Sequence, residues 1–233
     1  MIEIYAHRGA NREAPENTLL AFQKALEIGV DGIELDVLLT KDKVPIVRHN
    51  KDIAGRLIHK MTLAEISAID LGAGQKIPTL VQALELLAAY PCQVILDLKK
   101  QPGMVRTACE LIGGIAAELI PLHRLSVSSF HPTYLTAFQR YHPKVPLAWI
   151  VSRRSFTLVP MALSGKFLKV CALHPGLWLL TPGLVARARA LGWKIRSWVA
   201  NRPEDFAKAM ALKIDGVFTD DPRLARNILQ GGN

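Results

Sequence analysis

Short apolar segments alternate with amphipathic helical segments along almost the whole chain, and this alternation constrains the fold more than any other feature. Strands that alternate with helices form parallel sheets. Eight such repeats in 233 residues predict a closed (β/α)8 TIM barrel. An open doubly wound sheet is the alternative, but no glycine-rich phosphate loop supports it. The eight candidate strands are Ile2–His7, Gly32–Val37, Gln93–Leu98, Leu125–Phe130, Leu147–Val151, Leu168–Leu173, Lys194–Val199 and Gly216–Thr219.

The segments between these strands carry helix start and stop signals. Thr18 is a suitable N-cap for a helix that ends at Gly29, where a glycine is expected just after the last turn. The later helices mostly begin next to a proline, which is favoured in the first helical turn. We expect them at residues 78–89, 103–118, 132–141, 182–191, 203–212 and 222–229.

One segment interrupts the alternation. Residues 44–48 also have the composition of a strand, but only Leu38 to Lys43 separate them from the second strand. A parallel crossover needs about a dozen residues, so this strand must return as a hairpin. Residues 38–77 are therefore predicted to be an insertion after the second strand, at the end of the barrel where active sites lie. No linker or change of composition divides the chain, so we expect a single domain over residues 1–233.

Composition excludes several classes of protein. Half of the residues are apolar, which excludes a disordered chain. No run approaches the ~18 apolar residues of a membrane span, and no signal peptide is recognisable, so we expect a cytoplasmic protein without stable membrane insertion. Cys92, Cys109 and Cys171 are scattered and are expected to be reduced core thiols. The net charge of +9 suits an anionic ligand or solvated basic faces, and no nucleic-acid motif accompanies it.

Polar side chains gather at the carboxyl ends of the first three predicted strands. Glu34 and Asp36 lie two residues apart on one strand, so their side chains share a face. In a barrel closed in chain order these three strands are neighbours, each ~4.8 Å from the next. His49 ends the hairpin strand and can fold back over this arc. The arc itself comprises His7, Arg8, Glu34, Asp36, Asp97 and Lys99.

Three carboxylates held this close repel one another, so one must take up a proton unless a cation neutralises them. Their donors are all oxygens and no cysteine lies nearby, which favours one divalent cation, Mg²⁺ or Ca²⁺, over zinc. The structural alternative is a set of carboxylates that are simply paired with arginine and lysine side chains.

The same residues carry a resemblance to a known family. The segments His7-Arg8-Gly9, Pro15-Glu16-Asn17-Thr18, Glu34-Leu35-Asp36-Val37 and His49 after Val44-Pro45-Ile46-Val47 resemble the opening signature of the glycerophosphodiester phosphodiesterase family. Further matches follow in order at Asp97-Leu98-Lys99, Ser128-Ser129-Phe130, Trp198-Val199-Ala200-Asn201 and Asp215-Gly216-Val217-Phe218-Thr219-Asp220. The resemblance covers nearly the whole chain, and the opening segments are specific as a set.

This resemblance implies a metal-dependent enzyme that hydrolyses glycerophosphodiesters to sn-glycerol 3-phosphate and an alcohol. The family has a (β/α)8 barrel with a small insertion after the second strand, in agreement with the pattern above. The implied roles are metal binding for Glu34, Asp36 and Asp97; acid–base catalysis for His7 and His49; phosphate binding for Arg8 and Lys99; and substrate contacts at the mouth for Glu16 and Trp198. The implied partner is a small-molecule diester, and we expect a monomer or a weak homo-oligomer.

The sequence departs from the family pattern at two positions. Asn50 stands after His49 where the family usually has Asp, and Asp97 stands where it usually has Glu. An amide cannot raise a neighbouring imidazole's pKa by charge; Asp52 is a possible substitute. Because Asp is one methylene shorter than Glu, direct ligation needs a closer strand or a bridging water. We therefore expect a retained site with an altered metal preference or a reduced rate.

Two other functions remain open from sequence. A related barrel phosphodiesterase acting on lysophospholipid or sphingolipid would have an apolar membrane-docking loop, and the insertion offers only Ile53, Leu57, Ile58 and Met61. A non-catalytic barrel that binds phosphorylated ligands is the second. The remaining histidines are expected at the surface or in hydrogen-bonded core positions, although His174 follows the sixth predicted strand and can reach the mouth.

Overall fold

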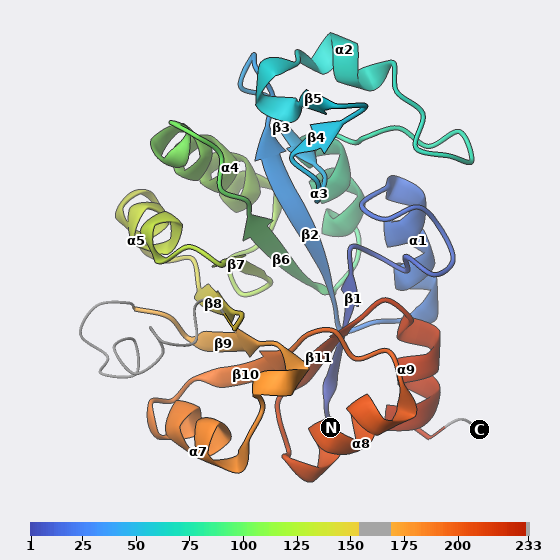
Figure 1. The fold of residues 1–233 in the computed structure, drawn as a ribbon, viewed down its shortest axis with the longest axis vertical. Coiled ribbons are helices and arrows are strands. Elements are labelled where there is room, and N and C mark those ends of the chain that lie inside the picture. The colour runs from blue at the N-terminus through green and yellow to red at the C-terminus, as the bar shows by residue number, and fades with distance from the viewer. Residues whose placement is uncertain (154–168, 232–233) are drawn as a thin grey trace.

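Within residues 1–153 and 169–231, which the computed structural model describes, eight parallel strands close into a barrel (Figure 1). Closure is direct, because β1 pairs with the last strand on one side and with β2 on the other. The (β/α)8 prediction is therefore confirmed. In order around the barrel, the strands are β1 (Glu3–His7), β2 (Gly32–Leu39), β6 (Gln93–Leu98), β7 (Leu125–Ser129), β8 (Leu147–Val151), β9 (Ala172–Pro175), β10 (Lys194–Ser197) and β11 (Gly216–Thr219).

The sixth barrel strand differs from its prediction. Leu168–Leu173 was the expected strand, and Leu168 lies outside the described residues; the observed strand β9 begins at Ala172 and continues to Pro175. Its ladder with β8 runs to the pair Val151 and Pro175, because a proline still offers its carbonyl to a neighbouring strand. That carbonyl accepts a hydrogen bond from the Ser197 hydroxyl at 2.7 Å. His174 is thus part of the barrel wall.

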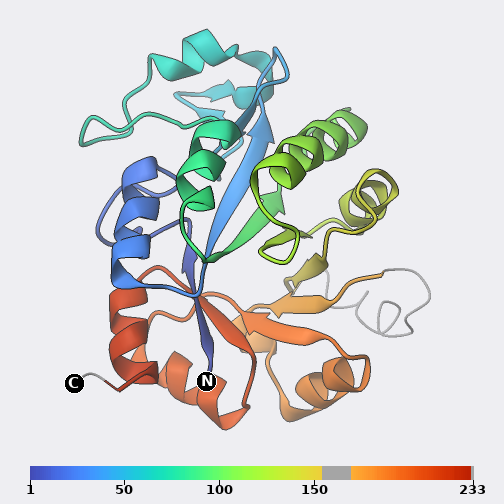
Figure 2. The ribbon, with the colours of Figure 1, turned by 180° about the vertical axis from the view of Figure 1, so that it is seen from behind.

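Helices surround the barrel on the outside, as Figures 1 and 2 show. Thr18 caps α1 by accepting a hydrogen bond from the Ala21 amide, and Gly29 ends this helix with a left-handed φ of 80°, as predicted. Proline begins four of the later helices. The outer helices are α1 (Leu19–Ile28), α3 (Leu80–Ala88), α4 (Val105–Leu119), α5 (Pro132–Tyr141), α7 (Pro182–Ala190), α8 (Pro203–Ala211) and α9 (Pro222–Leu229).

The predicted insertion is present and has its own small core. β3 (Pro45–Val47) pairs antiparallel with β2, which confirms the hairpin return. A cluster of buried side chains, comprising Leu38, Ile46, Ile53, Ile58, Met61, Ile66 and Ile77, then holds the rest of the insertion together. The elements of this part are β4 (Asp52–Ile53), β5 (Arg56–Leu57), the 3-10 helix η1 (Ile58–Lys60) and α2 (Leu63–Ser67), at the top of Figure 1.

The amino-terminal end of the barrel interior is filled by side chains. The Tyr5 ring is fully buried there, and the Arg196 guanidinium lies 4.9 Å from its centroid. A Cβ atom at Gly32 would come within 2.5 Å of the Tyr5 ring, so the glycine makes room for it. Arg196 Nε donates a hydrogen bond to Glu3 at 3.0 Å. Within the part of the chain that the structure describes, side chains therefore close the amino-terminal end of the barrel interior.

The three cysteines differ in burial. Cys92 and Cys109 are buried thiols as expected, but Cys171 is exposed because it precedes β9 rather than lying inside it. Among the described residues, no helix combines the length and the apolar character that crossing a membrane requires.

Candidate active site

A pocket of about 170 Å³ lies at the carboxyl ends of the barrel strands. This volume far exceeds the ~10–15 Å³ needed for one water molecule, so the pocket admits a small organic ligand. Eight of the nine residues proposed for the site from sequence line it; Glu16 does not. The lining residues are His7, Arg8, Glu34, Asp36, His49, Asp97, Lys99, Ser128, Phe130, Ile150, His174, Trp198, Val199 and Phe218.

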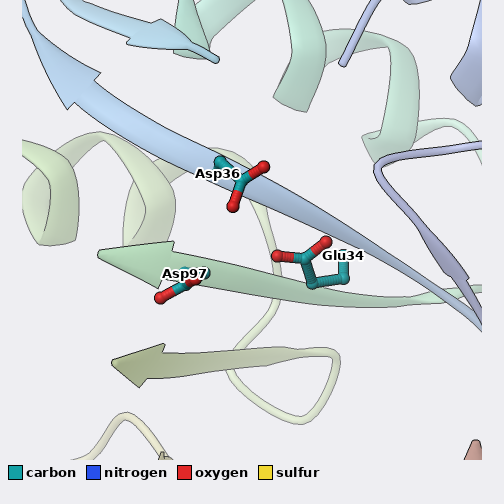
Figure 3. A group of neighbouring side chains, drawn as sticks. All are labelled: Glu34, Asp36 and Asp97. Atoms are coloured by element: carbon teal, nitrogen blue, oxygen red, sulfur yellow. The ribbon is translucent and has the colours of Figure 1, made fainter. Parts of the chain in front are cut away.

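Three carboxylates converge on one side of this pocket. Glu34 and Asp36 leave β2, and Asp97 lies directly opposite Asp36 on the neighbouring β6 (Figure 3). All three are buried, and one oxygen of each lies within 4.8 Å of the others. The strand register therefore brings the shorter Asp97 side chain to the same point as the two carboxylates of β2.

Basic side chains and an amide surround these carboxylates. Lys99 Nζ lies 2.6 Å from Asp36 Oδ1 and 2.5 Å from Asp97 Oδ2. Arg8 Nε lies 3.1 Å from Asp36 Oδ2, and Asn17 Nδ2 donates to the same oxygen at 2.7 Å. Asp36 is thus the most heavily neutralised of the three acids.

The pKa values follow from this arrangement. Burial raises the pKa of Glu34 well above its usual range, and the charges of Asp36 and Asp97 add to the effect. Burial also acts on Asp36, but Lys99 and Arg8 outweigh it and lower its pKa to about 2. Burial raises the pKa of Asp97 despite Lys99. Crowding of the three carboxylates thus favours the neutral form most at Glu34, as expected for like charges held close together.

The donor set fits a hard divalent cation. Asp97 Oδ1 is buried and accepts no hydrogen bond from any residue that the structure describes, although a buried carboxylate oxygen normally has a partner. Two oxygens that share one Ca²⁺ ion at about 2.3–2.6 Å can lie as far apart as those found here. Glu34, Asp36 and Asp97 are therefore the residues that would hold Mg²⁺ or Ca²⁺.

His7 is oriented by a network that the sequence reasoning did not assign. Its Nδ1 lies 2.7 Å from Asp220 Oδ1, just beyond the end of β11. Asp220 is held in turn by Asn11 Nδ2 at 2.7 Å and Asn201 Nδ2 at 2.6 Å. Burial favours the neutral form of Asp220, but the bonds from His7, Asn11 and Asn201 prevail and hold its pKa well below the usual range. A carboxylate on Nδ1 leaves Nε2 of His7 as the nitrogen available to a ligand.

His49 is placed by the hairpin. The backbone amide of Arg48 donates to the Asp36 carbonyl at 2.9 Å, which fixes the next residue beside the carboxylates. His49 Nδ1 lies 3.0 Å from Asn50 Oδ1, so the amide, and not Asp52, provides the partner for this ring. Burial lowers the pKa of His49, and the neighbouring Asp36 charge only partly compensates.

The turn after β1 presents Arg8 to the site. Arg8 adopts a left-handed φ of 63°, and Gly9 follows with φ 82°. A Cβ atom at Gly9 would lie 2.7 Å from the backbone of Ala21 in α1, so only glycine permits this close approach. Glu16 Oε2 accepts a hydrogen bond from Arg8 Nη1 at 2.7 Å. Glu16 therefore contacts a residue of the pocket lining without lining the pocket itself.

The opposite side of the pocket is largely apolar. Trp198 is half-buried and packs edge-on against Phe130, with ring centroids 5.6 Å apart. Its Nε1 donates to the His174 carbonyl at 2.8 Å, which fixes the indole. Further inside, His174 meets Phe218 with centroids 4.9 Å apart.

Sequence reasoning did not assign Asn17 or Asp220 to the site. Both lie within segments that match the family signature, and Asp220 directly follows a strand, which is the available signal. His174 was expected at the surface or hydrogen-bonded in the core, with the mouth of the barrel within its reach. The structure places it in the pocket wall, where it is buried and its Nε2 has no hydrogen-bond partner among the described residues.

Comparison with known proteins supports the resemblance. Residues 7–224 match the model of the glycerophosphoryl diester phosphodiesterase family. The chain is 32% identical to a glycerophosphodiester phosphodiesterase of Caldanaerobacter subterraneus subsp. tengcongensis, over 98% of both chains. It is similar to the crystal structure of a putative glycerophosphoryl diester phosphodiesterase from Silicibacter pomeroyi (TM-score 0.92, 26% identity, covering 99% of this chain and 93% of that one). An Oleispira antarctica phosphodiesterase in complex with the product sn-glycerol-3-phosphate is also similar (TM-score 0.91, 26% identity, covering 98% and 97%).

Proposed function

Because the chain belongs to the glycerophosphoryl diester phosphodiesterase family, we propose that it hydrolyses glycerophosphodiesters to sn-glycerol 3-phosphate and an alcohol. The observation that carries this proposal is the pocket itself. His7 and His49 line it together with three carboxylates and two basic side chains. A relative of similar structure is known in complex with this product, which supports the choice of substrate class.

The carboxylates Glu34, Asp36 and Asp97 would hold one divalent cation, Mg²⁺ or Ca²⁺. When bound, such a cation neutralises charge that develops on the phosphate oxygens in the transition state. Arg8 and Lys99 would contribute to the same end by binding the phosphate. Their pairing with Asp36 beside the carboxylates and their place in the pocket lining support this role.

The reaction needs a nucleophile and a protonated leaving group. In the substrate, the glycerol 2-hydroxyl lies next to its own 3-phosphate, and attack within one molecule can supply ~7 kcal/mol or more of the barrier. His7 would accept the 2-hydroxyl proton while the oxygen bonds to phosphorus. His49 would donate a proton to the departing alcohol as its bond to phosphorus breaks. The product of this step is a cyclic glycerol phosphate.

Water would then open the cyclic phosphate with the roles of the histidines reversed. His49 would accept a proton from the water, and His7 would return its proton to the 2-hydroxyl oxygen as the ring bond breaks. Asp220 suits this role of His7, because it keeps Nε2 directed at the substrate and stabilises the ring when it is protonated. We also propose that the substrate is a small molecule and that the protein acts in the cytoplasm without stable insertion into a membrane.

The lipid-directed alternative finds no support in the insertion. Ile53, Ile58 and Met61 are buried in the insertion's own cluster, and only Leu57 among the four apolar residues is exposed. These side chains stabilise the insertion and do not form an apolar surface that could dock on lipid.

The histidine assignment has a direct test. His7→Ala and His49→Ala should each reduce release of sn-glycerol 3-phosphate from glycerophosphocholine by roughly 10²–10⁴-fold, the usual contribution of a positioned acid or base. Circular dichroism of each variant controls for folding. Activity within about tenfold of wild type in both folded variants would contradict this mechanism.

A further inference from the structure

His174 is the member of the pocket wall for which the proposed reaction gives no role. Its side chain is 1% exposed, yet it lines the pocket together with the two catalytic histidines. Its Nε2 is buried and has no hydrogen-bond partner within the described residues. Buried polar atoms in native proteins are nearly always paired, so this nitrogen requires an explanation.

The surroundings of His174 determine the chemistry it can perform. Burial and the positive charge of Arg196 lower its pKa well below the usual range, so the ring is neutral. Phe218 packs edge-on against it, and Ile150 lies opposite it in the strand register. A neutral imidazole offers one donor and one acceptor and carries no charge for a phosphate. Its natural ligand is therefore another neutral polar group, such as a hydroxyl.

The shape of the pocket indicates which hydroxyl of the substrate can reach His174. Arg8 and Lys99, the side chains proposed to bind the phosphate, are held by Asp36 of β2. His174 belongs to β9, which lies across the barrel from β2 in the strand order. His174 and Phe218 are almost fully buried, whereas Trp198 and Phe130 at the mouth are half-buried. An alcohol leaving group of variable size needs the open mouth, so the glycerol end of the diester must point inward. Among the described lining residues contributed by β7 to β11 and the turns that follow them, only Ser128 and His174 have polar side chains other than the indole of Trp198, whose Nε1 is already bonded.

We propose that His174 Nε2 hydrogen-bonds the terminal hydroxyl of the substrate's glycerol and makes the site specific for glycerol over 1,2-propanediol. This inference rests on the proposed function, because it takes its ligand from that reaction. His174 acts as a specificity residue and exchanges no proton with the reacting atoms. The Trp198 indole, bonded to its carbonyl, closes the same wall of the glycerol site.

The test compares two phosphates that differ only in this hydroxyl. Binding of sn-glycerol 3-phosphate and of 1,2-propanediol 1-phosphate is measured by calorimetry in saturating Mg²⁺. Wild type should prefer the glycerol compound by roughly 10- to 100-fold, because the analogue leaves a buried nitrogen unpaired. In His174→Leu the preference should fall to within about threefold. His174→Gln places an amide near the position of Nε2 and should retain most of the preference.

Ile150→Val is the matched control. It removes one methylene beside His174 without changing any hydrogen bond, so the affinity ratio should stay within about twofold of wild type, whatever happens to absolute affinity. Equal binding of the two compounds by wild type would overturn the inference even if His174→Leu does not fold. An unchanged ratio in folded His174→Leu, or no measurable binding of either compound, would also overturn it.

The affinity ratio does not depend on turnover, so the two proposals fail separately. Wild type is assayed in parallel for release of sn-glycerol 3-phosphate from glycerophosphocholine. Release without the His174-dependent ratio refutes this inference alone. The ratio without release refutes the proposed hydrolysis and leaves a glycerol phosphate site.

Discussion

The two histidines of the site have unlike partners at Nδ1. His7 bonds a carboxylate, Asp220, whereas His49 bonds the neutral amide of Asn50. A carboxylate both orients an imidazole and stabilises its protonated form; an amide only orients it. Both rings therefore have an oxygen atom as the partner of Nδ1, but only the partner of His7 is charged. A single substitution can remove the charge beside His7 or add one beside His49.

Asp220→Asn tests the positioning of His7. We expect kcat to fall by about 10–100-fold with little change in KM, because the amide removes the charge and can donate to Nδ1, which turns the ring to the wrong tautomer. The pH–rate profile should change as well, which a purely structural defect would not cause. Asp221→Asn is the control. Asp221 caps α9 by accepting a hydrogen bond from the Leu224 amide, and Asn can cap the helix in the same way, so kcat should not change. A kcat equal to wild type would refute the role of Asp220.

Asn50→Asp tests the electrostatics of His49. Burial lowers the pKa of this imidazole, and a carboxylate at position 50 would raise it by stabilising the charged ring. The limb of the kcat/KM profile that reports His49 should therefore move to higher pH, by about one unit or less, because position 50 is exposed and solvent screens its charge. Asn50→Ala, which supplies no partner, should not move it upward. Profiles of wild type and Asn50→Asp that superimpose would contradict this account.

At the scale of elements, the site depends on two close junctions. The register of β2 against β6 sets Asp36 opposite Asp97, and the turn after β1 places Arg8 beside Asp36. This turn is possible because Gly9 packs against Ala21 of α1 without a side chain. The position of α1 therefore helps to determine the position of Arg8, a residue proposed to bind the phosphate.

Gly9→Ala should weaken both stability and activity. The new methyl would clash with the Ala21 backbone and would force a left-handed φ on an L residue, a combined cost of ~1–3 kcal/mol. Urea unfolding measures this cost. Gly114→Ala in α4 is the matched control: its added methyl meets no neighbouring atom, so it should stabilise the helix by ~0.5–1 kcal/mol. Equal effects of the two substitutions would contradict the role of the turn.

Periodicity and turn chemistry predicted most of the elements. The alternation of segments predicted the barrel, and the short spacing before residue 44 predicted the hairpin and the insertion. The sixth strand was misplaced, because Leu168–Leu173 is apolar while the true strand contains His174 and Pro175, which score poorly as strand residues. A local sequence pattern indicates which side chains are buried. It does not indicate which residues pair through backbone hydrogen bonds with a strand that is distant in the sequence.

The candidate site was predicted in part. Residues at the ends of the early strands were found because strand order alone brings them together. Asp220 was missed because its contact with His7 joins positions 213 residues apart and exists only when the barrel closes. Glu16 was expected at the mouth; it pairs with Arg8 and is not among the residues that line the pocket. Such contacts depend on tertiary geometry that no local pattern contains.

In the whole molecule, barrel closure joins two unlike halves of one pocket. β1, β2, β6 and their adjoining loops supply the charged side, and β7 to β11 with theirs supply the mostly apolar side. Tyr5 and Arg196 fill the amino-terminal end, and the pocket lies at the carboxyl ends of the strands, where the insertion follows β2. A diester can therefore bind with its phosphate on the charged side and its glycerol against the other.

Release of sn-glycerol 3-phosphate is the direct measure of the metal-dependent hydrolysis proposed for this protein. The protein is treated with EDTA, dialysed, and assayed on glycerophosphocholine before and after addition of Mg²⁺ or Ca²⁺. We expect no release without metal and recovery with one of the two ions, and no recovery in Asp97→Ala, which removes a proposed ligand. Full release in excess EDTA, or none with either ion from folded wild-type protein, would contradict the account.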